Sequence, residues 1–150
     1  MTNSPIARFF DAFARQSSAD NVQAQIAQFA DVFLAAGPQG AKCVHSSDFA
    51  PALAKRTQLF NSLGCRSTAL VSLEETPLDA RYFLVRTRWQ MNFSRPNTDP
   101  EQVLADSTFI VDTVSEEFRI VFYLAHQDIM QVLKDRGIAP AELSATSRSE

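Results

Sequence analysis

A long run of alternating side chains, residues 81–93, constrains the fold of this chain more than any other segment. One set of alternate positions is apolar apart from one threonine and comprises Phe83, Val85, Thr87, Trp89, Met91 and Phe93. The other set mixes charged, polar and apolar side chains and comprises Tyr82, Leu84, Arg86, Arg88, Gln90 and Asn92. Because successive residues of a strand point to opposite faces, the run predicts a long strand with one buried face.

The segments around this run also have the character of strands. Residues 68–73, 103–114 and 118–125 are rich in β-branched and apolar side chains. The turns between the strands are predicted at residues 74–79, 94–100 and 116–117. Strands that follow one another through short turns pair antiparallel, so the second half of the chain predicts an antiparallel sheet.

The first half of the chain is predicted to be mainly helical. Ser4 and Pro5 indicate a helix start, with serine as the cap and proline in the first turn. Apolar residues then recur at helical spacing over residues 6–13, 22–33 and 49–63. Short strands are candidates at 32–34 and 43–45, on either side of a turn at Gly37–Gly40.

The C-terminal part predicts one more helix and a tail. The helix begins at Gln127 or Asp128 and ends at Gly137, and Asp128 beside His126 is interpreted as its cap. Residues 139–150 are rich in Ala, Ser and Thr, and we expect a flexible tail there.

Composition excludes several classes of function. The net charge is −3 and no Lys-rich run is present, so we expect no nucleic-acid partner. No apolar run approaches the ~20 residues of a membrane span, and residues 1–5 lack the pattern of a signal peptide. We therefore expect a cytoplasmic protein with no membrane contact, in which Cys43 and Cys65 are free thiols.

The order of the elements gives the chain a resemblance to a known superfamily. The local match is Phe-Ala-Asp-Val-Phe at residues 29–33, followed by Gly37 and Gly40. On this order and motif, residues 4–136 resemble the nuclear transport factor 2-like superfamily, a cone-shaped α+β fold with the outline of cystatins. The resemblance implies one domain over residues 1–150, with N-terminal helices packed on a curved, mostly antiparallel sheet and a C-terminal helix. It also implies a pocket between helices and sheet, and a homodimer formed through the sheet.

The best-defined enzyme residues of that superfamily are not matched here. The resemblance to its steroid isomerases implies a Tyr on the first helix that donates a hydrogen bond to an oxyanion. This chain has Phe9, Phe10 and Phe13 there, and a phenyl ring cannot donate one. The resemblance to its epoxide hydrolases implies an Arg-x-Asp motif on a strand, and no Arg of this chain is followed two residues later by Asp. Its dehydratases pair a His with an Asp, so Asp31 and His45 are candidates for lyase or isomerase chemistry, unless each caps a turn or faces solvent.

The remaining expectations concern a pocket and an interface. A pocket for a small apolar ligand is expected among inward-facing side chains, unless these only pack the core: Phe13, Phe29, Trp89, Met91, Phe109 and Tyr123. The opposite face of the long strand offers a dimer contact, unless it is solvated: Tyr82, Leu84, Arg86 and Arg88. No metal-ligand spacing or phosphate-binding loop is present, and we expect no metal or cofactor.

The sequence thus leaves open three functions from different classes. The first is a small-molecule-binding protein with an apolar pocket. The second is a noncatalytic dimeric module that interacts through its sheet. The third is an enzyme that uses the Asp31–His45 pair.

Overall fold

A six-stranded curved sheet is the framework of the molecule, and its strands follow the order β2-β1-β6-β5-β4-β3. The strands are β1 (Phe29–Gly37), β2 (Gly40–His45), β3 (Cys65–Pro77), β4 (Tyr82–Phe93), β5 (Glu101–Asp112) and β6 (Arg119–Ala125). All neighbours pair antiparallel except β1 and β6, which are parallel. The structure is a computed structural model that describes residues 4–18 and 21–140.

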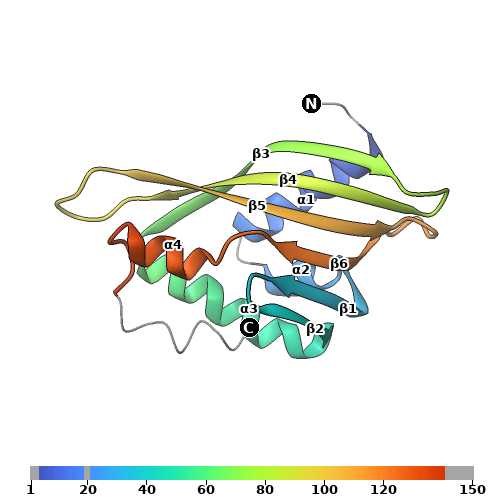
Figure 1. Cartoon of the computed structure of the whole chain (residues 1–150), viewed down its shortest axis with the longest axis horizontal. Coiled ribbons are helices and arrows are strands. Elements are labelled where there is room, and N and C mark those ends of the chain that lie inside the picture. Colours follow the sequence, from blue (N-terminus) through green and yellow to red (C-terminus); the bar gives the residue numbers. More distant parts are fainter. Residues whose placement is uncertain (1–3, 19–20, 141–150) are drawn as a thin grey trace.

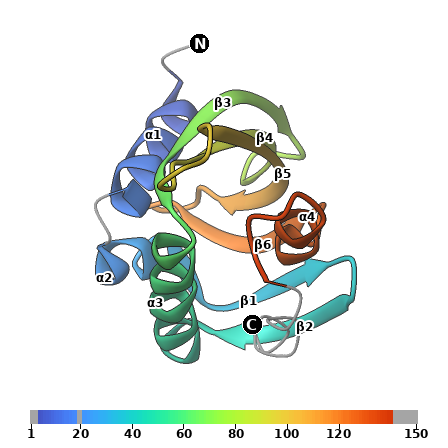
Figure 2. The ribbon, with the colours of Figure 1, turned by 90° about the vertical axis from the view of Figure 1, so that its left-hand side faces the viewer.

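Helices lie against the concave side of this sheet. They are α1 (Pro5–Ser18), α2 (Val22–Ile26), α3 (Ser46–Ser62) and α4 (Ile129–Asp135). Figure 2 shows the sheet curling around α1, α2 and α3, and Figure 1 shows α4 beside the long β4–β5 hairpin. Phe10 of α1 lies 4.9 Å from Phe109 of β5 between ring centroids, and Leu133 of α4 packs with Phe93 of β4. The predicted α+β class, with N-terminal helices on a curved sheet and a C-terminal helix, is confirmed.

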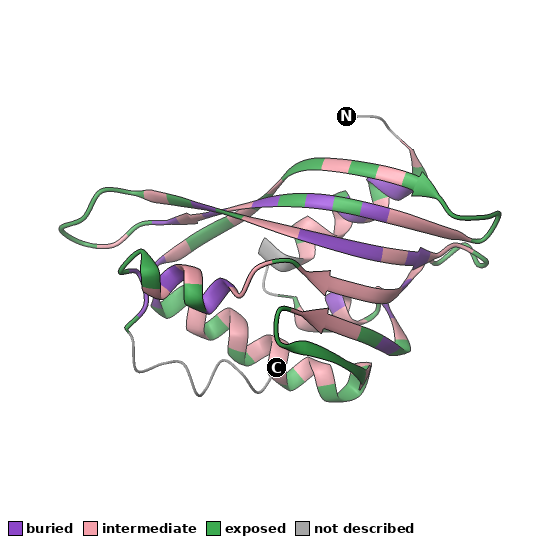
Figure 3. Ribbon diagram, in the orientation of Figure 1, coloured by how far each residue is buried: buried purple, intermediate pink, exposed green. Residues whose placement is uncertain are grey.

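Strand β4 buries alternate side chains, as its sequence predicts. Val85, Trp89 and Phe93 are buried and point toward the helices, whereas Arg86 and Arg88 between them are exposed. Figure 3 shows this banding of buried and exposed residues along the central strands. Each fully buried side chain of this size stabilises the fold by roughly 1.5–3 kcal/mol.

Thr87 is a polar residue on the buried face of β4, and its hydroxyl is fully bonded. It donates to the carbonyl of Ser107 at 3.1 Å and accepts from Trp89 Nε1 at 2.7 Å. Because both polar groups find partners, their burial carries no unpaired-donor penalty. The same hydrogen bond fixes the orientation of the Trp89 indole.

The predicted helix starts and ends are largely confirmed. Ser4 Oγ accepts from the Ala7 amide at 3.0 Å, which caps α1. Asp128 Oδ1 accepts from the Gln131 amide at 3.2 Å, which caps α4. Gly64 follows α3 with a φ of 99°, a backbone conformation that glycine adopts without strain.

The second predicted helix is shorter than expected. Its apolar spacing extends over residues 22–33, but α2 ends at Ile26 and β1 begins at Phe29. A four-residue spacing brings Phe29 and Phe33 to one face of a helix, and equally to one face of a strand. The segment forms a strand because this conformation buries both rings in the core, with 4.6 Å between their centroids.

Strand β3 is longer than predicted. Residues 74–79 were expected to form a turn, but the strand continues to Pro77 and pairs with β4 along its whole length. β3 is one of the two edge strands of the sheet. An edge strand tolerates proline because its outer amides need no ladder partner.

The packed part of the chain extends beyond Arg136. Ile138 and Ala139 are buried beside Leu133, so Ala139 belongs to the core and not to the predicted tail. Residues 141–150 lie outside the described residues. None of the described helices combines the length and apolar character that a bilayer span requires.

Gly64→Ala is expected to destabilise the fold more than Gly137→Ala. Both glycines have positive φ, 99° and 75°. A Cβ at Gly64 would lie 2.6 Å from Arg95 Cγ and 2.9 Å from the Ser94 carbonyl oxygen, whereas one at Gly137 would meet open space. We expect a loss of about 1 kcal/mol at Gly137 and about 2 kcal/mol or more at Gly64, measured by urea denaturation. Equal losses would contradict the close approach at Gly64.

Candidate functional site

A cavity of about 210 Å³ lies between the helices and the concave face of the sheet. We call it the inner cavity. Its wall includes every residue that the sequence predicted for a pocket: Phe13, Phe29, Trp89, Met91, Phe109 and Tyr123. The Phe13 ring lies 5.8 Å from the rings of Trp89 and Phe109 between centroids, so α1 closes the cavity by aromatic contact. That these residues bind a ligand stays a prediction.

Small side chains on β5 explain why this space is not filled. Ala105 lies opposite Trp89 in the β4–β5 register, and Ser107 lies opposite Thr87. Both line the inner cavity. On either side of them β5 carries larger inward-facing residues, Val103 and Phe109, which are buried. The hollow therefore follows from a large–small pairing across two adjacent strands.

The α3 and β3 side of the inner cavity is polar. The polar residues in its wall, besides Ser107 and Tyr123, are Gln25, Arg56, Thr57, Asn61, Cys65, Arg66, Ser67 and Thr68. Among the described lining residues the charged side chains are arginines, and none is Asp, Glu or His. Burial raises the pKa of the Cys65 thiol, although hydrogen bonds to Thr68 and to the Ser67 carbonyl act in the opposite direction.

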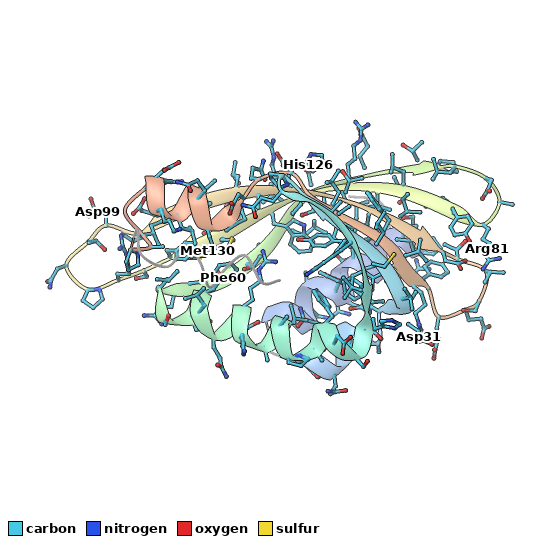
Figure 4. The ribbon with its side chains drawn as sticks, turned by 60° about the horizontal axis from the view of Figure 1, so that its bottom comes forward. Asp31, Phe60, Arg81, Asp99, His126 and Met130 are labelled. Carbon is cyan, nitrogen blue, oxygen red and sulfur yellow. The ribbon has the colours of Figure 1, made fainter. Side chains whose placement is uncertain are left out.

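A second, larger hollow of about 960 Å³ lies between the β1–β2 hairpin, α3 and the start of α4. We call it the outer groove. Its ionisable lining residues, apart from Arg56, Cys43 and Tyr123, are Lys42, His45, Asp48 and Asp128. Figure 4 shows two further lining residues, Phe60 and Met130, between α3 and α4. Gln39 Nε2 donates to Asp128 Oδ2 at 2.8 Å and so ties the hairpin turn to α4.

The inner cavity and the outer groove adjoin, because they share part of their walls. The shared residues are Phe49, Arg56, Phe60, Tyr123 and Ile129, and we call this region the junction. The Arg56 guanidinium lies over the Phe60 ring, 5.1 Å from its centroid. The Tyr123 ring stacks on Phe109 at 5.2 Å. The polar groups of the junction therefore belong to side chains that aromatic contacts hold in position.

Comparison with known proteins identifies the architecture. No family model matches the sequence, and none of the curated proteins matches it either. An NTF-2-like protein of unknown function from Shewanella oneidensis superposes with a TM-score of 0.66 at 13% identity, over 85% of this chain and 100% of that one. This chain has the nuclear transport factor 2-like fold. The resemblance read from the order of the elements is thereby confirmed for the fold.

Other solved structures with this nuclear transport factor 2-like fold carry different names. A ketosteroid isomerase-like protein from Erwinia carotovora gives a TM-score of 0.61 at 15% identity, over 85% of this chain and 98% of that one. The β subunit of benzoate 1,2-dioxygenase from Burkholderia mallei gives 0.62 at 14% identity, over 85% and 91%. Because one fold carries such different proteins, function has to be argued from the site.

The structure does not join Asp31 and His45, the pair predicted from the sequence, by a hydrogen bond or an ion pair among the described residues. Both side chains are exposed. His45 precedes α3 and lines the outer groove, whereas Asp31 lines neither hollow. Figure 4 shows Asp31 away from Phe60 and Met130. A catalytic role for the pair stays a prediction.

His126 and the carboxylates near it form no metal centre. His126 directly follows β6, and its Nε2 lies 2.7 Å from Oγ1 of Thr108 on β5. Asp106 beside it accepts from Arg88 Nε at 2.7 Å, and this hydrogen bond lowers the pKa of Asp106. Within residues 4–18 and 21–140, no group of three or more His, Cys, Asp or Glu side chains is arranged to hold a metal.

The outer face of the sheet carries the residues predicted for a dimer contact. Arg86 and Arg88 are exposed there, and Tyr82 and Leu84 are half-buried. Strand register aligns apolar residues in one row across four strands, which is Leu84, Ile110, Phe122 and Leu34. Leu34 is 37% exposed, and Leu104 elsewhere on this face is 49% exposed. The described helices lie on the other side of the sheet (Figure 2).

The polar α3 wall of the inner cavity was missed by the sequence reasoning. Arg56 shares one side of α3 with Phe49, Leu53 and Phe60, because these positions are three or four residues apart. A cation within an otherwise apolar stripe was the available signal. Pairing of that stripe with the sheet was not visible from the sequence.

The two thiols are expected to differ in reactivity. Cys43 is exposed in the outer groove, whereas Cys65 is half-buried in the wall of the inner cavity and its pKa is raised. Because the thiolate is the nucleophile, Cys65 should react with iodoacetamide at pH 8 roughly tenfold more slowly than Cys43. Cys43→Ser and Cys65→Ser isolate the two rates, read by mass spectrometry. Faster labelling of Cys65 would contradict the described environment.

Proposed function

We propose that this chain is a small-molecule-binding protein whose ligand occupies the inner cavity. The observation that carries the proposal is a cavity of about 210 Å³ with an aromatic wall on the sheet side and polar groups on the α3 side. An apolar cavity of roughly 150 Å³ is large enough to bind benzene. A ligand with an apolar body of about two fused rings is therefore a suitable size.

The wall chemistry favours binding over acid–base catalysis within the cavity. A general base near neutral pH is usually His, Asp or Glu within hydrogen-bond reach of the substrate. The described residues that line the inner cavity include none of these. A few polar groups on one side of an apolar pocket orient a ligand without reacting with it.

The proposal is tested with 2-naphthamide, a neutral two-ring probe, by isothermal titration calorimetry. The wild-type protein is expected to bind it saturably. Ser107→Leu should weaken binding at least about tenfold, because the larger side chain fills the cavity beside Trp89. Gln102→Leu is the matched control, since Gln102 is exposed on the same strand and lines neither hollow.

A second readout connects the heat of binding to this cavity. In Cys43→Ser, bound 2-naphthamide should slow the alkylation of Cys65, which lies in the same wall. Thermal unfolding verifies that Ser107→Leu is folded. Absence of binding to the wild-type protein, or full affinity in folded Ser107→Leu, would contradict the proposal.

We also propose that the chain forms a homodimer through the outer face of the sheet. What supports this is the apolar row Leu84, Ile110, Phe122 and Leu34, flanked by Arg86 and by the Arg88–Asp106 ion pair. An apolar centre with Arg and polar groups at its rim is typical of protein interfaces. A dimeric module and a ligand-binding cavity are compatible, since they use opposite faces of the sheet.

Leu84→Glu should dissociate this dimer, because it places a carboxylate at one end of the apolar row, directly beside Ile110. Light scattering after size exclusion is expected to give twice the 16.7 kDa chain mass for the wild-type protein and the monomer mass for the variant. Leu78→Glu is the control, because Leu78 is 52% exposed in the β3–β4 turn, outside the row. A wild-type monomer, or a dimer that survives Leu84→Glu, would refute the contact.

A further inference from the structure

The junction has a chemistry of its own within the ligand site. Its apolar members are Phe49, Phe60 and Ile129, and its polar members are Arg56 and Tyr123. Arg56 supplies N–H donors with a fixed positive charge, and Tyr123 supplies one O–H donor. Among the residues that the structure describes, no carboxylate lines the junction. The polar end of a ligand lodged in the inner cavity would meet donors there.

From this arrangement, which rests on the proposed ligand-binding function, we infer that the ligand is an apolar carboxylate. Its apolar body occupies the inner cavity, and its carboxylate lies at the junction, bound by Arg56 and Tyr123. The planar guanidinium matches the geometry of a carboxylate and binds it through charge-assisted hydrogen bonds. Arg66, a second cation in the cavity wall, adds favourable potential for an anion.

Both donors are held by aromatic neighbours before any ligand arrives. The Arg56 guanidinium lies over the Phe60 ring at 5.1 Å, and the Tyr123 ring stacks on Phe109 at 5.2 Å with 27° between the planes. No hydrogen bond of the Tyr123 hydroxyl is found in the described part of the chain. Groups that are already oriented lose little side-chain entropy on binding, so more of the interaction appears as affinity.

The surrounding charge pattern gives the junction its selectivity. The carboxylates of the outer groove, Asp48 and Asp128, line that groove alone and not the inner cavity. Asp128 is engaged by Gln39 and by the amide of Gln131. An anion therefore meets cations on the cavity side of the junction, whereas a cationic ligand would meet Arg56 and Arg66 there.

The inference is tested with a matched pair of probes, 2-naphthoate and 2-naphthamide, which share their ring body and differ in charge. Calorimetry at pH 7 should give at least about tenfold tighter binding of the carboxylate to the wild-type protein. Arg56→Gln should abolish that preference and leave the affinity for the amide unchanged within about threefold. Tyr123→Phe should weaken the carboxylate roughly three- to tenfold.

Control variants separate a binding role from a structural one. Lys55→Gln removes a positive charge from the adjacent position of α3, lines neither hollow, and should retain the carboxylate preference. Arg56→Lys keeps the charge and should restore part of the preference that Arg56→Gln loses. Thermal unfolding of each variant verifies that it is folded. If Arg56→Gln does not fold, the carboxylate preference is measured in Tyr123→Phe and Arg56→Lys instead.

The outcomes distinguish this inference from the proposal on which it rests. If the amide binds as tightly as the carboxylate, or the preference survives Arg56→Gln, the carboxylate site is refuted while ligand binding in the cavity stands. If neither probe binds the wild-type protein, both fail together. A preference that Lys55→Gln reduces as much as Arg56→Gln would overturn the role of the junction in favour of general surface charge.

Discussion

Aromatic packing between α1 and the concave face of the sheet is the interaction on which the rest of the structure depends. Phe10 is fully buried against Phe109, and Phe13 contacts Phe29, Trp89 and Phe109. Each such ring pair contributes about 0.5–1.5 kcal/mol beyond the area that it buries. Because these rings join α1 to three strands of the sheet, β1, β4 and β5, they fix the position of α1 over its concave face. The inner cavity is the space that remains between this contact and the helices α3 and α4.

The cavity is a property of residue size as much as of fold. Across β4 and β5, large residues face small ones at the centre, with Trp89 opposite Ala105. Well-packed cores contain few empty spaces of this volume, because each lost contact costs dispersion energy. A methyl group and a hydroxymethyl group at residues 105 and 107 therefore keep open a space that larger apolar side chains would close at little backbone cost. This is the physical reason to read the hollow as a site.

The alternation of apolar and polar residues made the sheet predictable from the sequence. The site was only partly predictable, because it depends on contacts between segments that are far apart in the chain. The two faces of β4 were assigned correctly, and the apolar side chains later found around the cavity, such as Trp89 and Phe109, follow from that assignment. Phe29 and Phe33 were assigned to a helix because a four-residue spacing fits both structures. The polar wall from α3 was missed because Arg56 and Tyr123 line the same hollows only once α3 lies across the sheet. The cation within the apolar stripe of α3 was a local signal, but the sequence of α3 does not say which strand it packs against.

The separation of charge between the two hollows bears on what the molecule can do. Carboxylates and the histidine His45 line the outer groove, whereas the charged residues in the described wall of the inner cavity are arginines. Proton abstraction from a ligand in the inner cavity would require a base to reach across the junction, past Phe49 and Phe60. Stabilising a bound anion requires no such movement, because Arg56 and Tyr123 already lie at the boundary. Binding an anion in the inner cavity thus requires less movement of side chains than acid–base chemistry there would. These residues therefore favour binding as the function of the cavity.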